Sequence, residues 1–334
     1  MNMMKWIEDT IASPVKKAMP VLSFPSIQKM GVNVNELINS ADLQAQGIAK
    51  IAELTDAAAA VSYMDLSVEA EAFGSDIRFD ENEVPSVIGC IIEDEEEAEA
   101  LEVPEVGAGR TGLCIEAIRK ARALVTDRPL FAGGIGPFSL AGRLLDVSEA
   151  MYYCYDEPDM VHIVLEKVTE FIIKYCNAYK ETGADGIVIA EPLAGLLDPD
   201  NAREFSSEYM QKIISEVQTD EFLVIYHNCG NSVVQSIDDI TATGGRVFHF
   251  GNAIDMRDVV GKVPSNCLVM GNIDPSSQFR NGTPESIYEA TTKLMSDICP
   301  KYPNYIISSG CDIPPLAPWE NINSFFKAVS DYYK

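Results

Sequence analysis

The sequence contains no apolar run long enough to span a membrane. A transmembrane helix needs about 20 consecutive apolar residues, and every hydrophobic run in this chain is shorter. The first ten residues, MNMMKWIEDT, carry acidic side chains where a secretory signal peptide has its apolar segment. We therefore expect a cytoplasmic protein.

Basic residues are half as frequent as acidic ones. The 334 residues include 25 Lys and Arg against 51 Asp and Glu, which gives a formal net charge of −26. A surface of this kind repels the phosphates of nucleic acids and of anionic lipids. We therefore expect neither nucleic acid nor a membrane among the partners of this protein.

A dense cysteine framework and a dinucleotide loop are also missing. The eight cysteines are spread along the chain, unlike those of a small disulfide-rich secreted domain, and most are expected to be buried packing residues. The segment FAGGIGPFSLAGRL, residues 131–144, is rich in glycine but lacks the G-x-G-x-x-G spacing that binds a dinucleotide. No nucleotide cofactor is expected.

Short apolar runs alternate with longer helical patterns, which is typical of βα units around a parallel sheet. The expected strands are residues 20–24, 59–63, 129–135, 186–190, 222–227, 246–250, 267–271 and 305–309. The expected helices are residues 44–56, 110–124, 149–180, 202–217, 231–242, 283–298 and 319–332. Eight strands with intervening helices predict a (β/α)₈ TIM barrel that forms a single domain over residues 1–334. A doubly wound open sheet is the alternative.

Residues 64–105 do not follow this rhythm. They contain turn residues, an acidic run and a hairpin-like segment, FGSDIRFDENEVPSV. We interpret them as an N-terminal excursion over the barrel mouth rather than as a separate domain.

Histidine occurs only three times, and one of the three ends an apolar run in LVIYHNCGNS. Residues i and i+2 of a strand face the same way, so His227 and Cys229 can both face the barrel axis while Asn228 faces away. Cys311 follows the last strand in SSGCDIPP. The His-x-Cys pattern alone is a weak metal signal, but the carboxyl ends of barrel strands meet at one mouth, and nitrogen and sulfur ligands together suit zinc.

The other two histidines are expected to be structural. His162 lies in a helical run and His249 lies inside an apolar strand, so neither is predicted to bind the metal. Three protein ligands would then leave one zinc position open for a substrate.

An open position beside two thiolates favours an exogenous thiol, because zinc holds sulfur as a thiolate at neutral pH and so presents a nucleophile. Hydrolysis by a zinc-bound water is the alternative, although two sulfur ligands make the metal a weaker Lewis acid. Glu191, at the end of the strand in IAEPLAG, has three candidate roles: a fourth ligand that the thiol displaces, a proton acceptor, or a cap for the next helix. Asn228, Asn252 and Asp274 are expected to line the mouth and contact substrate.

Four segments together carry a resemblance to a known family. YHNCGN, SSGCDIPPLAPWENI, GNIDPS and LSVEAEAFGSDIRFDENEVPSV resemble the zinc-dependent methylcobamide:coenzyme M methyltransferases of the uroporphyrinogen decarboxylase superfamily, over nearly the whole chain. The resemblance implies a (β/α)₈ barrel and a zinc ion held by His227, Cys229 and Cys311. It also implies a corrinoid partner protein whose methylcobamide gives its methyl group to a small thiol such as coenzyme M.

The decarboxylase branch of that superfamily is disfavoured by an absence. Its arginine-rich loop, of the RQAGRY type, corresponds here to FPSIQKMG, in which Lys29 is the only cation. Several substrate carboxylates need more than one positive partner. A tetrapyrrole decarboxylase and a non-catalytic corrinoid-binding barrel remain the alternatives. The motifs leave the thiol and the oligomeric state open, and Arg110, Arg143 or backbone N–H groups are candidates for binding a sulfonate.

Overall fold

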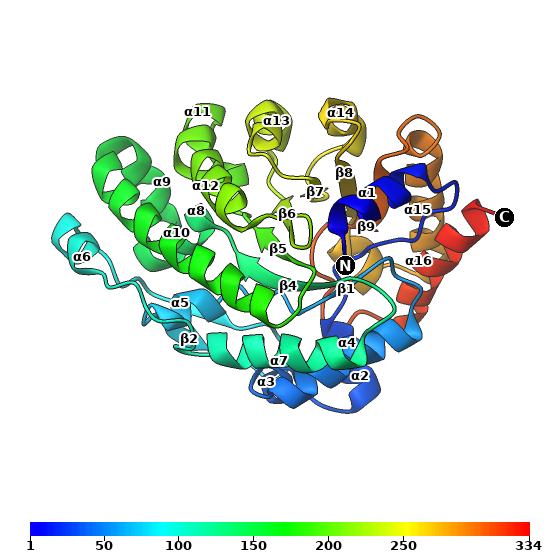
Figure 1. Ribbon diagram of the computed structural model, residues 1–334, viewed down its shortest axis with the longest axis horizontal. Helices are drawn as coiled ribbons and strands as arrows, with labels where there is room; N and C mark the ends of the chain where they lie inside the picture. The colour runs from blue at the N-terminus through cyan, green and yellow to red at the C-terminus, as the bar shows by residue number, and fades with distance from the viewer.

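The computed structural model describes residues 1–334. Its main sheet has seven parallel strands that neighbour one another in chain order. They are β1 (Ala60–Val61), β4 (Leu130–Ile135), β5 (Gly186–Ala190), β6 (Leu223–Asn228), β7 (Val247–Phe250), β8 (Leu268–Ile273) and β9 (Tyr305–Ser309). The sheet is curled, and helices form a ring outside it (Figure 1). The predicted barrel-type α/β fold is confirmed.

The predicted strand at residues 20–24 is wrong. The chain at residues 18–21 lies between β9 and β1 without forming a regular strand. Met19 N donates to Ile307 O (3.1 Å) and Ala58 N donates to Ala18 O (2.8 Å). Pro20 has no N–H to give to a ladder, which interrupts regular strand pairing at this point. The curled sheet is therefore completed by an irregular segment and has seven strands where the sequence predicted eight.

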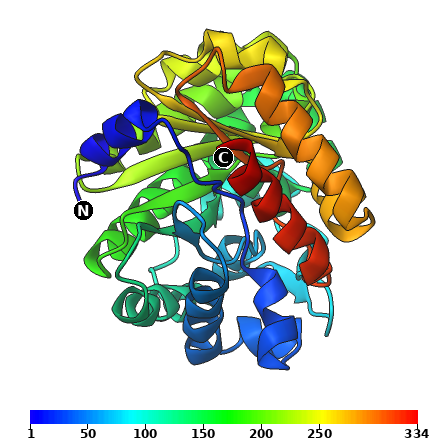
Figure 2. The same cartoon turned by 90° about the vertical axis from the view of Figure 1, so that its right-hand side faces the viewer.

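All seven predicted helical ranges are helical, one of them as two helices, and the helices at residues 3–12 and 137–145 were not predicted. The longer helices are α1 (Met3–Ala12), α4 (Ala41–Leu54), α7 (Thr111–Leu124), α8 (Pro137–Leu145), α9 (Val147–Asp156), α10 (Pro158–Glu181), α12 (Glu208–Val217), α13 (Val233–Ala242), α15 (Pro284–Ile298) and α16 (Trp319–Tyr332). The predicted helix 149–180 is two helices, α9 and α10, because the residue before Pro158 avoids the helical conformation. Near the C-terminus, α15 and α16 pack side by side (Figure 2).

Shorter helical segments complete the connections. They are η1 (Phe24–Ser26), α2 (Ile27–Met30), α3 (Val34–Ile38), α5 (Val68–Ala72), α6 (Glu95–Ala100), η2 (Ala194–Leu196), α11 (Pro199–Ala202), η3 (Arg203–Ser207), α14 (Met256–Val259), η4 (Val260–Lys262) and η5 (Pro275–Arg280). No helix is both long enough and apolar enough to cross a lipid bilayer.

The interior of the barrel is packed with side chains that alternate along the strands. A cluster of 16 buried residues fills it, including Val188, Ala190, Leu223, Ile225, Val247, Leu268, Met270 and Ile306. Helix α1 covers one end of this cluster with Met3 and Ile7, next to the residues that begin the strands. The next inward positions toward the carboxyl ends of β6, β7 and β9 are polar: His227, His249 and Ser308. Apolar packing therefore gives way to a polar site at the end of the barrel where such folds carry their chemistry.

The excursion between β1 and β4 contains the predicted hairpin. Strands β2 (Asp76–Arg78) and β3 (Ser86–Ile88) pair antiparallel. Residues of this hairpin line a pocket of about 370 Å³ together with Arg143 and Asp312. Since Asp312 directly follows Cys311, the hairpin lies at the barrel mouth, as predicted.

A buried carboxyl, Glu69, anchors the excursion to the barrel. One oxygen, Oε1, accepts a hydrogen bond from Ile135 N (3.1 Å), and the other has no partner. Burial raises the pKa of Glu69 from 4.5 to about 8, with the bond from Ile135 opposing the shift. The folded state therefore binds a proton that the unfolded chain releases between these two values.

The replacement Glu69→Gln should change how stability depends on pH. A carboxyl with a raised folded-state pKa contributes most below its ordinary pKa, and the contribution is lost as pH rises from about 5 to 8. Glutamine keeps an acceptor for Ile135 and never ionises. We expect the urea midpoint of the variant to exceed that of the parent protein increasingly from pH 5 to pH 8. A difference between the two midpoints that does not grow with pH would contradict this account.

Candidate metal centre

The three predicted metal ligands lie together at the barrel mouth. His227 is on β6, Cys229 follows β6 directly, and Cys311 follows β9. One ligand atom from each residue lies within 4.8 Å of the other two. Strands β6 and β9 are separated by two others in the sheet, so it is the curl of the barrel that brings their carboxyl ends to a common point.

The position of Cys229 depends on tight local packing. Asn228 Oδ1 accepts a hydrogen bond from Gly230 N (3.0 Å), which turns the chain immediately after the strand. At Gly251, after β7, an added Cβ would lie 2.4 Å from Cys229 Cβ. Glycine is therefore needed for the two loops to approach this closely.

His227 forms a pair with His249 on the neighbouring strand. The two residues are in register, their Nδ1 atoms are 2.8 Å apart, and both side chains are buried. His249 Nε2 lies 2.7 Å from Ser309 O and 3.0 Å from Ser308 Oγ. The Nε2 atom of His227 is buried and has no hydrogen-bond partner. Burial lowers the pKa of His249 well below its ordinary value. His249, expected from the sequence to be only structural, thus touches a predicted ligand.

The two sulfur atoms of the group lie within 4.8 Å of each other. Their proximity lowers the pKa of Cys229 and raises the pKa of Cys311 to about 12. A divalent cation would displace the thiol protons, since metal ions bind cysteine as thiolate.

Glu191 lies outside the group of three. It follows β5, is fully buried, and accepts hydrogen bonds from Ser139 N (3.0 Å) and Ser206 Oγ (2.7 Å), both in the helical layer behind the strand. Burial raises its pKa to about 7. The bond from Ser139, in the first turn of α8, is the contact of a helix-capping residue. A catalytic role for Glu191 stays a prediction.

The three predicted substrate-binding residues also stay predictions, and the structure separates them. The side chain of Asn228 is used in the turn before Gly230. Asp274 Oδ1 accepts from Ser276 N (2.8 Å) and Ser277 N (2.9 Å), which caps η5. Asn252 lines a pocket of about 430 Å³ together with Asp274. Of the three, Asn252 and Asp274 share a cavity, and Asn228 does not line it.

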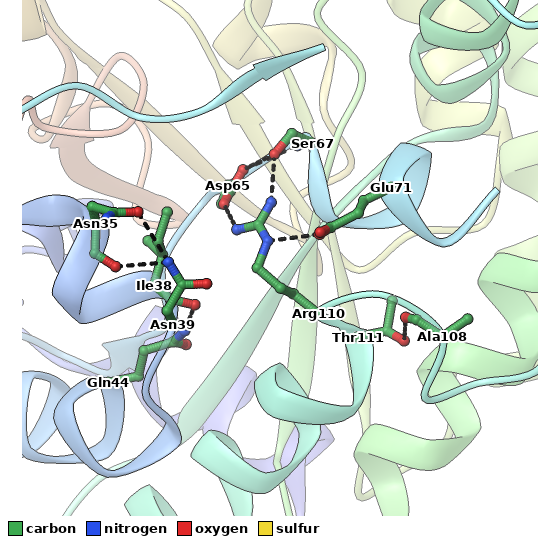
Figure 3. A network of polar contacts seen from close by, with 10 residues as sticks. All are labelled: Asn35, Ile38, Asn39, Gln44, Asp65, Ser67, Glu71, Ala108, Arg110 and Thr111. Carbon is green, nitrogen blue, oxygen red and sulfur yellow. Dashed lines mark hydrogen bonds and ion pairs between the residues drawn. The ribbon is translucent and has the colours of Figure 1, made fainter. Parts of the chain in front are cut away.

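The two arginines considered for binding an anionic group differ sharply. Arg110 is surrounded by Asp65, Ser67 and Glu71 and makes ion pairs with both carboxylates (Figure 3). Arg143 lines the 370 Å³ pocket beside Asp312, makes no ion pair, and has a buried Nε atom without a partner. Arg143 is therefore the cation at the mouth that is available to a ligand.

The sequence model of the uroporphyrinogen decarboxylase (URO-D) family matches residues 5–332. The chain belongs to this family. Similar family members include methylcobamide:CoM methyltransferases: MtbA of Methanosarcina acetivorans is 28% identical over 80% of this chain and 78% of its own length, and MtaA of Methanosarcina barkeri is 30% identical over the same shares. Uroporphyrinogen decarboxylase of Hydrogenovibrio crunogenus is 26% identical over 82% of this chain and 78% of its own length. The family relatives are therefore enzymes of two reaction types.

Similar solved structures include one that matches this chain over its full length. A methyltransferase from Methanosarcina mazei superposes with a TM-score of 0.86, 25% identity and complete coverage of both chains. A B12-independent methionine synthase from Shewanella sp. W3-18-1 has a TM-score of 0.63 at 10% identity over 96% of each chain, which shows a shared fold alone.

Proposed function

We propose that this protein is a zinc-dependent methyltransferase that moves a methyl group from a protein-bound methylcobamide to a small thiol such as coenzyme M. The observation that carries the proposal is the group of His227, Cys229 and Cys311, with ligand atoms within 4.8 Å at the barrel mouth. The relatives named as methylcobamide:CoM methyltransferases support it. In this proposal residues 1–334 act as one domain and a separate corrinoid protein is the partner.

The donor set fits zinc. His227 offers an unpartnered Nε2 atom, and the two cysteines offer sulfurs within 4.8 Å of each other. One nitrogen and two sulfurs are typical zinc ligands, and three protein ligands are typical of sites that keep a position for substrate.

The reaction requires one bond to form and one to break. Zinc in this group would hold the sulfur of the incoming thiol as a thiolate and so make it a nucleophile at neutral pH. The S–C bond forms as the Co–C bond breaks, the electron pair of that bond stays on cobalt as cob(I)amide, and the thiol proton leaves to solvent. By holding the metal, His227, Cys229 and Cys311 would fix where the sulfur lies, and the packed barrel interior beneath them would exclude water from one side.

The pocket beside Cys311 suits a thiol with an anionic end. Arg143 provides an unpaired guanidinium there, and burial raises the pKa of Asp312 well above its ordinary value. A volume of about 370 Å³ is within the range of small-molecule sites. A corrinoid is much larger and would have to approach from outside on its own protein.

A decarboxylase function is less well supported, although some family relatives have that activity. The only cation in the segment FPSIQKMG is Lys29, and its Nζ atom lies 4.9 Å from the centre of the Trp319 ring. A tetrapyrrole substrate with several carboxylates would find no cluster of positive partners in this segment.

The test is an anaerobic assay of zinc-loaded protein with free methylcobalamin and a panel of thiols that includes coenzyme M. We expect thiol-dependent appearance of cob(I)alamin, followed by its absorbance, and loss of turnover when zinc is removed by a chelator and its return when zinc is restored. Turnover that survives complete removal of the metal would refute the proposed mechanism.

The variant Arg143→Met should lose preference for anionic thiols. A charge-assisted hydrogen bond contributes about 1.5–3 kcal/mol, so its loss should raise the KM for a sulfonated thiol by about 10–150-fold. A neutral thiol of similar size is the matched control, and its KM should change little. An equal effect on both thiols would show that Arg143 acts on the pocket as a whole and not on the anionic group.

A further inference from the structure

The hydrogen bonds around His249 determine which atom of His227 carries a proton. Ser308 Oγ donates to Met19 O (2.7 Å), so this hydroxyl has only lone pairs to offer in other directions. His249 Nε2 faces that hydroxyl and also faces Ser309 O at 2.7 Å. A carbonyl oxygen can only accept a hydrogen bond. The Nε2 atom of His249 therefore carries a proton.

The other nitrogen of His249 is then an acceptor. His227 Nδ1 lies 3.2 Å from the backbone carbonyl oxygen of His249, and a carbonyl oxygen can only accept a hydrogen bond. His227 therefore donates from Nδ1. The same atom lies 2.8 Å from His249 Nδ1, which accepts with its lone pair.

The consequence for His227 is a single tautomer. With its proton on Nδ1, its lone pair is on Nε2, the buried atom that has no partner in the protein. We propose that His249 is a positioning residue that holds His227 in the Nδ1–H tautomer and presents its Nε2 lone pair to the metal. This inference rests on the proposed function, because it assigns the metal to the group of His227, Cys229 and Cys311.

The pair follows from the alternation of the strands. His227 and His249 are register partners on adjacent parallel strands, and both continue an inward-facing apolar series, Leu223 and Ile225 on β6 and Val247 on β7. Side chains at matched positions on neighbouring strands face the same side and touch. A group that accepts a hydrogen bond from the other ring N–H of a metal-binding histidine typically improves metal affinity by about 10–100-fold.

The first test is nitrogen NMR of the metal-free protein. The chain has only three histidines, and His162→Gln, which alters a helix away from the barrel mouth, removes the third set of imidazole signals. We expect shifts of a protonated Nδ1 and an unprotonated Nε2 for His227, and the reverse for His249. A protonated Nε2 on His227 would overturn the inference, whatever the protein is found to catalyse.

The second test is zinc affinity, measured by competition with a chromophoric chelator. His249→Phe removes the acceptor, and His249→Gln places its amide near the position of Nε2, so both should bind zinc about 10–100-fold more weakly than the parent. His249→Asn places its amide oxygen near the position of Nδ1 and should retain more of the affinity than either. Thermal midpoints of the metal-free variants separate this effect from a general loss of folding.

The outcomes also distinguish this inference from the proposed function. A parent protein that binds zinc tightly, together with a folded His249→Phe that binds it equally tightly, would refute the role of His249 and leave the proposed function standing. A parent protein that binds no zinc would refute the proposed function and the metal-directed part of the inference together. Cobalt substitution adds a spectroscopic readout, because weaker binding through His227 should alter the ligand-field bands in the Phe and Gln variants.

Discussion

Replacing Cys311 with serine should lower thiol-dependent methyl transfer by at least about 100-fold. Loss of a partner that only contacts a ligand already costs about 10–100-fold in metal affinity or activity, and Cys311 is a proposed ligand itself. Serine has nearly the same shape, but its hydroxyl does not ionise at neutral pH and is a poor ligand for zinc. Measured zinc content and the methylcobalamin assay report the two consequences separately.

Cys299→Ser is the matched control for this experiment. Cys299 is also partly exposed, but it lies at the C-terminal end of α15, in a different pocket with Lys16 and residues that follow α1. We expect its zinc content and turnover to equal those of the parent. If Cys311→Ser retained a full complement of zinc and parental turnover, the metal would have to be held elsewhere, and the assignment of the centre would fail.

The metal group could be predicted from the sequence because its geometry depends on two general rules, the common mouth of the barrel strands and the alternation of side chains along a strand. In a parallel barrel all strands end at the same mouth, so a residue that ends one apolar run and a residue that ends another are neighbours even when 82 positions separate Cys229 from Cys311. The alternation of side chains then brought His227 and Cys229 to the same side. The structure places all three ligand atoms within 4.8 Å of one another.

The direction of the Glu191 side chain also follows from the alternation along the strands. Ala190 is the register partner of His227 and belongs to the inward-facing cluster, so the following residue starts from the outer face of the sheet. Counting alternate positions from His227 across to β5 would have predicted that the Glu191 carboxylate faces the helical layer. Its bonds to Ser139 and Ser206 are consistent with that direction.

Other features were not accessible from one sequence. The irregular segment at residues 20–24 has the apolar composition of a strand, and only the missing N–H of Pro20 indicated otherwise. The contact between His227 and His249 depends on the register of β6 against β7, and an error of one residue would turn one ring outward. The ion pairs of Arg110 join segments more than 35 positions apart, which no local pattern reveals.

The replacement Arg110→Met should destabilise the folded protein strongly. Arg110 precedes α7 and joins it to the excursion after β1 through Asp65 and Glu71, with an additional bond from its guanidinium to Ser67 Oγ (2.8 Å). The side chains of Arg110 and Asp65 are only 8% and 5% exposed. Removing one member of a buried ion pair leaves an uncompensated buried charge, which costs about 3–5 kcal/mol. The cost should appear as a large fall in the thermal or urea midpoint.

Two further variants serve as a control and as a test of the stranded charge. Arg119→Met removes an exposed arginine from the same helix, where it pairs with Glu116 at 52% and 41% exposure, and should change the midpoint little. The double variant Arg110→Met with Asp65→Asn removes both the cation and its most buried partner, and should recover part of the lost stability because the stranded charge is gone. Equal unfolding midpoints for Arg110→Met and Arg119→Met would contradict this prediction. They would mean that the carboxylates of Asp65 and Glu71 become hydrated when Arg110 is removed. In that case the excursion would be held to the barrel by its apolar contacts and Glu69 rather than by this ion-pair network.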